Sequence, residues 1–206
     1  MHVTPSPTER DLGDARKIVA SSRRVLLLLD IQNCMLSDNL ISVPPSHDVR
    51  KNLPDILACA RGAKPPPLII HVRNAGDAGD PDELNAPGWH LIYPPEESEL
   101  VIDKMKNNAF AGTRLEEIIP EDVEIVVAGF QTDFSVMATC IAARDRGNEV
   151  LLIKGGHATY DRMEMMHGGK VLVPGQRIEA VIEAKMEDLG VHVLDMKDLP
   201  DIFTNR

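Results

Sequence analysis

Three residues of this chain have side chains that could together catalyse acyl transfer, because they supply a carboxylate, a cation and a nucleophile. Asp30 ends an apolar run, Lys104 follows another, and Ser135 stands where a strand pattern gives way to a helix pattern. A hydroxyl on the first turn of a helix lies beside free backbone N–H groups, which can hold developing negative charge. Each residue also has a structural interpretation, as a strand-end cap, a surface ion or a helix cap.

The elements that must position these residues are predicted to be buried strands alternating with helices. Residues 25–29 are continuously apolar, which indicates a strand covered on both faces, as in a parallel sheet. Further apolar runs and helical patterns follow in alternation. The expected strands span residues 24–30, 67–73, 100–102, 124–128, 150–154 and 191–194, and the expected helices span residues 8–22, 46–61, 113–119, 133–146 and 176–189.

Six strands with helices between them predict an α/β fold, a doubly wound six-stranded parallel sheet with helices on both faces. We expect a single domain over residues 1–206, in which residues 1–22 form an N-terminal helical extension on the outside. In such sheets, ligands bind beyond the carboxyl ends of the strands. Asp30, Lys104 and the turn before Ser135 all follow expected strand ends, so the fold predicts that they share one location.

The composition argues against several other classes of protein. The net charge of −10 and the pI near 5.1 leave no basic patch of the size that phosphate neutralisation requires, so nucleic-acid binding is not expected. No stretch approaches the roughly 20 apolar residues of a membrane span, and residues 1–22 are too polar for a signal peptide. We therefore expect a cytoplasmic protein without membrane contact, whose three cysteines are reduced.

Four motifs occur in order along the chain. They are an apolar strand with Asp-x-Gln at residues 27–32, Lys104 followed by Phe110 and Gly112-Thr113, the segment Gly-Phe-Gln-Thr-Asp-Phe-Ser-Val at residues 129–136, and Gly-His-Ala-Thr at residues 156–159. In order and spacing they resemble the isochorismatase-like cysteine hydrolases, which include nicotinamidases, N-carbamoylsarcosine amidohydrolases, ureidoacrylate hydrolases and isochorismatases. The resemblance extends from residue 24 to about residue 194. It implies a Rossmann-like three-layer hydrolase that cleaves a C–N bond in a small amide, ureide or lactam.

The resemblance also implies a catalytic triad of Asp30, Lys104 and the residue at position 135. Asp30 would take a proton from the attacking nucleophile and later pass it to the leaving amine. Lys104 would lower the pKa of the nucleophile and keep Asp30 ionised through its positive charge. The peptide that links Phe130 and Gln131 is often cis in this family. It would aim the backbone N–H of Gln131, together with that of Ser135, into an oxyanion hole.

The sequence departs from the family at Ser135, where the cysteine hydrolases have cysteine. A thiol beside a lysine at a helix N-terminus ionises readily, whereas a serine hydroxyl needs a strong adjacent base, commonly histidine. His71, His90 and His157 all lie far from this position in sequence. Cys140 lies further along the expected helix, on a different face. The form with Ser135 is therefore expected to be inactive or weakly active.

Several interpretations of Ser135 are open. The one we favour is an introduced replacement of cysteine, which keeps the shape of the site while removing the nucleophile. In the second, the serine is natural and the protein is a ligand-binding pseudo-hydrolase. In the third, Asp30 acts as an acid without covalent catalysis, as the isochorismatase branch is thought to do for a vinyl ether, although that branch generally lacks the pair seen at Thr132 and Asp133. A purely structural α/β domain is the remaining alternative.

No cofactor or catalytic metal is expected. Nicotinamidases carry an aspartate and two histidines after the second strand, but His71 is followed by no second histidine nearby. The expected partner is a small-molecule substrate, and the resemblance makes a homo-oligomer the expected assembly. The loop of residues 74–95 is long enough to cover a site. The residues expected to contact the substrate are Gln32, Arg73, Trp89, Phe110 and Phe134.

Overall fold

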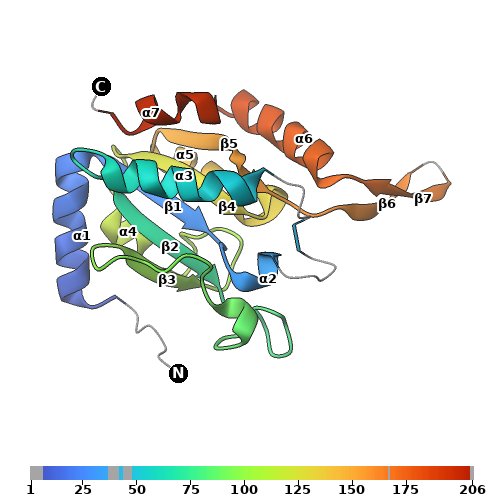
Figure 1. Ribbon diagram of the computed structural model, residues 1–206, viewed down its shortest axis with the longest axis horizontal. Helices are drawn as coiled ribbons and strands as arrows, with labels where there is room; N and C mark the ends of the chain where they lie inside the picture. The colour runs from blue at the N-terminus through green and yellow to red at the C-terminus, as the bar shows by residue number, and fades with distance from the viewer. Residues whose placement is uncertain (1–6, 37–41, 44–47, 167, 205–206) are drawn as a thin grey trace.

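The centre of the molecule is a six-stranded sheet in the order β3-β2-β1-β4-β5-β8 (Figure 1). The structure is a computed structural model that describes residues 7–36, 42–43, 48–166 and 168–204. Every neighbouring pair of strands in the sheet is parallel, which confirms the predicted fold class. The strands are β1 (Arg24–Leu29), β2 (Leu68–Asn74), β3 (Leu100–Lys104), β4 (Glu124–Phe130), β5 (Val150–Ala158) and β8 (His192–Asp195).

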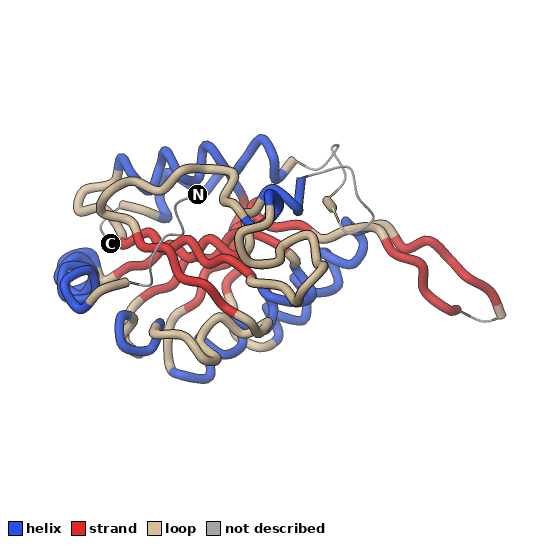
Figure 2. Tube along the Cα trace, turned by 90° about the horizontal axis from the view of Figure 1, so that it is seen from below, coloured by secondary structure: helices blue, strands red, loops and turns tan. Residues whose placement is uncertain are grey.

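Helices cover both faces of this sheet, as the edge-on view in Figure 2 shows. One face packs against α1 (Glu9–Ser22), α4 (Leu115–Ile118), α5 (Met137–Arg146) and α6 (Gly175–Asp188), and the other against α2 (Asn33–Leu36), α3 (Val49–Gly62) and α7 (Leu199–Ile202). Strand β1 shows why its sequence is continuously apolar. Leu27 and Leu29 belong to the first core and Leu26 and Leu28 to the second, because successive side chains of a strand point to opposite faces.

The structure departs from the sequence predictions in a hairpin, in two short helices, α2 and α7, and at the start of α5. An antiparallel hairpin of β6 (Arg162–Met166) and β7 (Gly169–Val173) projects from the body of the molecule and was not predicted (Figures 1 and 2). The helix expected from residue 133 begins instead as a π-helical turn, Thr132–Val136, and α5 starts at Met137. For the helix expected at residues 46–61, residues 46 and 47 lie outside the described residues, and α3 begins at Val49.

Helix α1, expected as a helical extension on the outside, packs its apolar side chains against the main core. Its buried residues Leu12, Ala15 and Val19 belong to the same cluster as the first face of β1. Among the described helices, none is both long enough and apolar enough to cross a membrane.

The order of the strands reverses between β1 and β4, where the chain turns from building one half of the sheet to building the other. Such a switch point leaves a crevice beyond the carboxyl ends of the strands, where ligands bind in open α/β sheets. The two strands approach closely at Gly129, which pairs with Leu29 and has a φ of +134°. A Cβ atom at Gly129 would lie 2.0 Å from the backbone oxygen of Leu29. Glycine is therefore required at this position.

We predict that Gly129→Ala lowers the free energy of unfolding by more than about 3 kcal/mol, because left-handed backbone strain adds to the clash with β1. Gly13→Ala is the matched control. Gly13 lies in α1 with no atom near its Cβ position, so alanine should stabilise the protein by about 0.5–1 kcal/mol. Urea unfolding measures both values, and equal effects of the two substitutions would contradict the close approach of β1 and β4.

Candidate active site

The three residues singled out from the sequence meet at the carboxyl edge of the sheet. Lys104 Nζ lies 3.0 Å from Asp30 Oδ2 and 3.0 Å from Ser135 Oγ. The ammonium has a third partner, Asn74 Oδ1, at 3.1 Å. Ser135, the most exposed member of the predicted triad, is only 5% exposed. The cluster is therefore a buried, charged group of side chains rather than a set of surface ions.

Four neighbouring strands hold this cluster. Lys104 ends β3, Asn74 ends β2, Asp30 follows β1, and Ser135 lies in the turn after β4. The register pairs Asn74 with Lys104 across β2 and β3. Partners in a parallel pair point to the same face about 4.8 Å apart, so the side chain of Asn74 reaches the ammonium directly. Asparagine at the end of a strand is a signal of the same kind as Asp30, but Asn74 was predicted to start the loop of residues 74–95, whereas it ends β2.

The backbone of Asp30 is fixed by a hydrogen bond, and burial disfavours the charged form of its side chain. It has a φ of 54° and donates its backbone N–H to the carbonyl of Val72 at 2.8 Å. Burial raises the pKa of its carboxyl above the ordinary value, while the charge of Lys104 and hydrogen bonds from Ser135 and Lys104 oppose that rise. Among the described residues, none hydrogen-bonds the buried Asp30 Oδ1. This oxygen is thus able to accept or carry a proton.

The turn that carries Ser135 is held in place from several sides. The Phe130–Gln131 peptide is cis, and the π-helical turn follows it directly. Thr132 Oγ1 is hydrogen-bonded to His157 Nδ1 at 2.9 Å. Asp133 accepts a hydrogen bond from Thr159 Oγ1 at 2.7 Å and pairs with Arg162 of the hairpin at 2.6 Å. These contacts fix the turn relative to β5 and the hairpin, and π-helical turns of this kind are frequent at functional sites.

Two of the three histidines named from the sequence, His71 and His157, are engaged elsewhere, and the third, His90, is exposed with its ring 5.5 Å from that of Trp89. His71 Nε2 lies 2.7 Å from Glu99 Oε2, and burial lowers the pKa of His71. His157 is buried and contacts Thr132 together with Glu183, whose Oε1 lies 3.3 Å from its Nε2. His157 therefore holds the turn of residues 132–136 through its hydrogen bond with Thr132.

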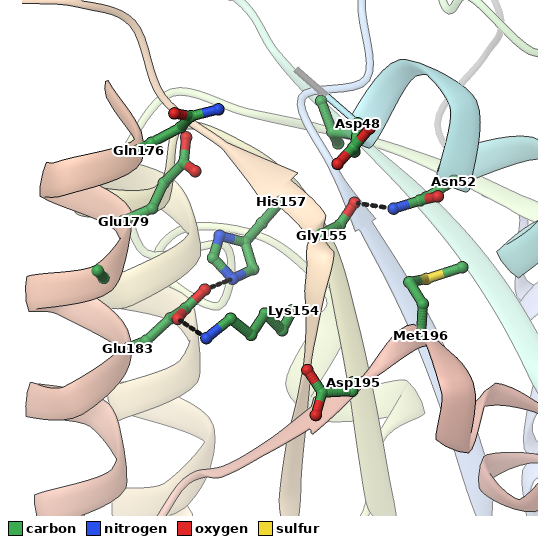
Figure 3. A pocket seen from close by; sticks show the side chains of 12 residues that line it. Asp48, Asn52, Lys154, Gly155, His157, Gln176, Glu179, Glu183, Asp195 and Met196 are labelled. Atoms are coloured by element: carbon green, nitrogen blue, oxygen red, sulfur yellow. Dashed lines mark hydrogen bonds and ion pairs between the residues drawn. The ribbon is translucent and has the colours of Figure 1, made fainter. Parts of the chain in front are cut away.

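A cavity of about 420 Å³ lies next to His157, between β5, α3 and α6 (Figure 3). Lys154 and His157 flank Glu183 on one side of it. Burial raises the pKa of Glu179 to about 7, with added repulsion from Glu183 and opposition from the Thr159 N–H. The residues that line this cavity do not include Asp30, Lys104 or Ser135. The described cavity is thus separate from the predicted triad.

The residues expected to contact substrate have protein partners of their own. Gln32 is fully buried and donates its Nε2 to the carbonyls of Asn74 and Trp89, at 2.9 and 3.0 Å. Arg73 forms two hydrogen bonds with Asp103 and stacks 3.6 Å from the Trp89 ring centroid.

The two phenylalanines contact arginines. The Phe110 ring is buried, with the Arg146 guanidinium 4.6 Å from its centroid, whereas Phe134 is half-buried and its ring centroid lies 5.9 Å from the guanidinium of Arg162. A role in substrate binding stays a prediction for all five residues.

Metal binding was not expected. Within the described residues, no group of three or more His, Cys, Asp or Glu side chains is arranged to hold a metal ion. Asp82, in the loop of residues 74–95, accepts a hydrogen bond from Asn74 Nδ2 at 2.7 Å. The absence of a metal from the chemistry stays a prediction.

The fold is a doubly wound α/β fold with polar residues gathered at its strand ends, and comparison with known proteins specifies the family. The isochorismatase domain model matches residues 24–186, so the chain belongs to the isochorismatase family. Two streptothricin hydrolases from Streptomyces noursei are 34% and 33% identical to it over 142 residues, which is 67% of this chain. The chain spans about half the length of these curated relatives, 55% of one and 50% of the other.

Solved structures show the same fold. An isochorismatase from Pseudomonas putida superposes with a TM-score of 0.73 at 31% identity, covering 86% of this chain and 90% of that chain. A pyrazinamidase of Pyrococcus horikoshii in complex with zinc superposes with a TM-score of 0.67 at 19% identity, covering 84% of this chain and 99% of that chain. The second likeness extends to the fold alone.

We predict that Glu179→Gln stabilises the protein at about pH 8 and has little effect at about pH 4.5. The pKa of Glu179 is raised in the folded state to about 7, so the folded chain keeps a proton that the unfolded chain releases from about pH 4.5 upwards. The free energy of unfolding therefore falls as the pH rises from about 4.5 to 7. Glutamine removes this loss and keeps an acceptor for the Thr159 N–H.

Calorimetric melting temperatures at the two pH values measure the effect. Glu187→Gln, at an exposed position of the same helix, is the control and should shift both melting temperatures equally. An equal shift for Glu179→Gln would show that burial does not perturb this carboxyl.

Proposed function

We propose that this chain has the architecture of an amidohydrolase that cleaves a C–N bond in a small amide, ureide or lactam. Asp30, Lys104 and a cysteine at position 135 form the triad in this proposal, and the serine now at position 135 makes the present form inactive or weak. The contact of one buried ammonium with both Asp30 and Ser135, at 3.0 Å each, is the observation that carries the proposal. A cation in contact with a nucleophile lowers the pKa of that nucleophile.

The chemistry of the cysteine form follows from these positions. Asp30 accepts the thiol proton, and the thiolate attacks the carbonyl carbon of the substrate. Backbone N–H groups of Gln131 and residue 135 stabilise the negative charge on the carbonyl oxygen. Asp30 then donates its proton to the leaving amine as the C–N bond breaks, which leaves a thioester. Finally Asp30 deprotonates a water that attacks the thioester, and the proton returns to the thiolate.

Serine performs the first step of this sequence poorly. A thiol has an unperturbed pKa near 8.5, whereas a hydroxyl ionises only with a strong adjacent base. His71 and His157 contact Glu99 and Thr132 instead of Ser135. The ammonium donates to the Ser135 oxygen rather than accepting its proton. This arrangement suits a nucleophile that is already close to ionisation, as a thiol is.

One observation favours a second candidate function, hydrolysis of a vinyl ether with Asp30 as a general acid. Burial raises the pKa of Asp30, and Asp30 Oδ1 has no hydrogen-bond partner among the described residues. A carboxyl with a raised pKa stays protonated to higher pH and so has a proton to donate to a substrate. This chemistry requires no nucleophile at position 135, so Ser135 would not impair it.

We predict that Ser135→Cys gains amide hydrolysis at least about 10³-fold above the parent, because a member of a catalytic triad is restored. The substrates to test are small amides, ureides and lactams, together with streptothricin, the compound named in the hydrolases of Streptomyces noursei. Intact-mass spectrometry should detect an acyl adduct on the variant. Ser135→Ala is the matched control and should form no adduct.

Three outcomes separate the candidate functions. Turnover or an adduct in Ser135→Cys supports the amidohydrolase. Neither turnover nor an adduct with any substrate removes the support for covalent catalysis and favours a ligand-binding pseudo-hydrolase. Hydrolysis of a vinyl ether by the parent, lost in Asp30→Asn and kept in Ser135→Ala, favours the general-acid reaction.

A further inference from the structure

We infer that Asn74, held by Asp82, is a positioning residue that fixes the ammonium of Lys104 against Asp30 and the nucleophile. The inference rests on the proposed function for its meaning and on the geometry of the strand ends for its support. It adds to the predicted triad a pair of residues that act through Lys104 and are not assigned to contact the substrate.

The ammonium of Lys104 has as many acceptors as it has N–H groups. Its acceptors are Asp30 Oδ2, Ser135 Oγ and Asn74 Oδ1 at 3.0, 3.0 and 3.1 Å. A lysine ammonium offers three donors and no acceptor. Because Lys104 is only 1% exposed, a donor without a protein partner would remain unpaired in a buried site at considerable cost. Asp30 and Ser135 accept two of the three N–H groups of Lys104, and the neutral amide of Asn74 accepts the third.

Asn74 is itself fixed through its backbone and its side chain. Its backbone N–H donates to Gln32 Oε1 at 2.8 Å, and its carbonyl accepts from Gln32 Nε2 at 2.9 Å. Its side-chain Nδ2 donates to Asp82 Oδ2 at 2.7 Å. A carboxylate only accepts and an ammonium only donates, so the two contacts set which way the amide faces. Asp82 thereby turns the oxygen of Asn74 towards Lys104.

The loop after β2 is shaped to bring Asp82 to this place. Gly76 donates its backbone N–H to the carbonyl of Asp82 at 3.0 Å. A Cβ atom at Gly76 would lie 2.2 Å from Asp82 Oδ1, so a side chain at this position would have to displace the Asp82 carboxylate. Asp82 is 9% exposed, unlike its exposed neighbours Asp77 and Asp80 in the same loop. Asp82 is therefore held by Asn74 inside the protein, whereas Asp77 and Asp80 are solvated.

Loss of Asn74 should weaken the effect of Lys104 on the nucleophile. Without the amide oxygen, one N–H of the buried ammonium loses its acceptor, which disfavours the charged form and frees its position. A thiolate at position 135 would then have a weaker counter-charge. In Ser135→Cys, we therefore expect Asn74→Ala to raise the pKa of the thiol at position 135 by roughly 0.5–1 unit, against roughly 1–3 units for Lys104→Met, which removes the charge.

The test is the pH dependence of iodoacetamide alkylation, which requires no substrate and no turnover. The Ser135→Cys protein of residues 1–206 is alkylated over a range of pH, and the parent protein gives the background from its other thiols. That background should be slow, because burial raises the pKa of Cys34 and of Cys140 to about 12 and also raises that of Cys59. Mass spectrometry of peptides assigns the modification to position 135.

Asn107→Ala is the matched control, since Asn107 is exposed and lies just beyond Lys104 in the chain. It should leave the thiol pKa unchanged. Melting temperatures of all variants are measured in parallel. A thiol pKa that is unchanged in Asn74→Ala overturns the inference, whether or not the melting temperature falls, because a purely structural role would affect stability alone. An unchanged thiol pKa in Lys104→Met overturns it as well.

This result is independent of the proposed function. If Ser135→Cys hydrolyses none of the substrates but Asn74→Ala raises the thiol pKa, the positioning role stands and the amide chemistry fails. If Ser135→Cys hydrolyses an amide and Asn74→Ala leaves the thiol pKa unchanged, the amide chemistry stands and the positioning role fails.

Discussion

The structure of the site depends on one buried cation. Lys104 is 1% exposed, and an ion taken out of water costs several kcal/mol unless its surroundings replace the lost hydration. Its three acceptors come from three other strand ends of the sheet. Moving any of these strands leaves the ammonium partly unpaired. The charge therefore ties the order and register of β3, β2, β1 and β4 to the geometry of the site.

The register shows how strict this requirement is. Asn74 and Lys104 are direct partners, as are Arg73 and Asp103. A slip by one residue would turn each side chain to the opposite face of the sheet and would break both pairs. At the same switch point, Gly129 brings β4 close to Leu29 of β1, which brings the turn bearing Ser135 beside Asp30. The approach of two backbones and the pairing of one charge thus act on the same crevice.

Much of this arrangement could be predicted from the sequence, and the exceptions have physical causes. The continuous apolar run of β1 predicts a strand with two covered faces, and the polar residues after strand ends predict a shared edge. The hairpin of β6 and β7 was missed because it packs outside the main sheet, with Met163 and Met165 exposed, so no buried run marks it. Asn74 was missed because its role depends on the register with Lys104, and pairing between distant strands cannot be read from local pattern. The triad roles come from family resemblance, and the contacts of Lys104 with Asp30 and Ser135 support them.

The most direct measurement of the central claim is the side-chain 15N NMR signal of Lys104 near neutral pH. We expect an ammonium signal whose protons exchange slowly with water, because three protein acceptors hold them in a buried site. Lys104→Met assigns the signal by removing it, and exposed Lys106 provides the fast-exchanging reference. A neutral amine at position 104, or exchange as fast as that of Lys106, would contradict the claim that a fixed, buried charge organises this site.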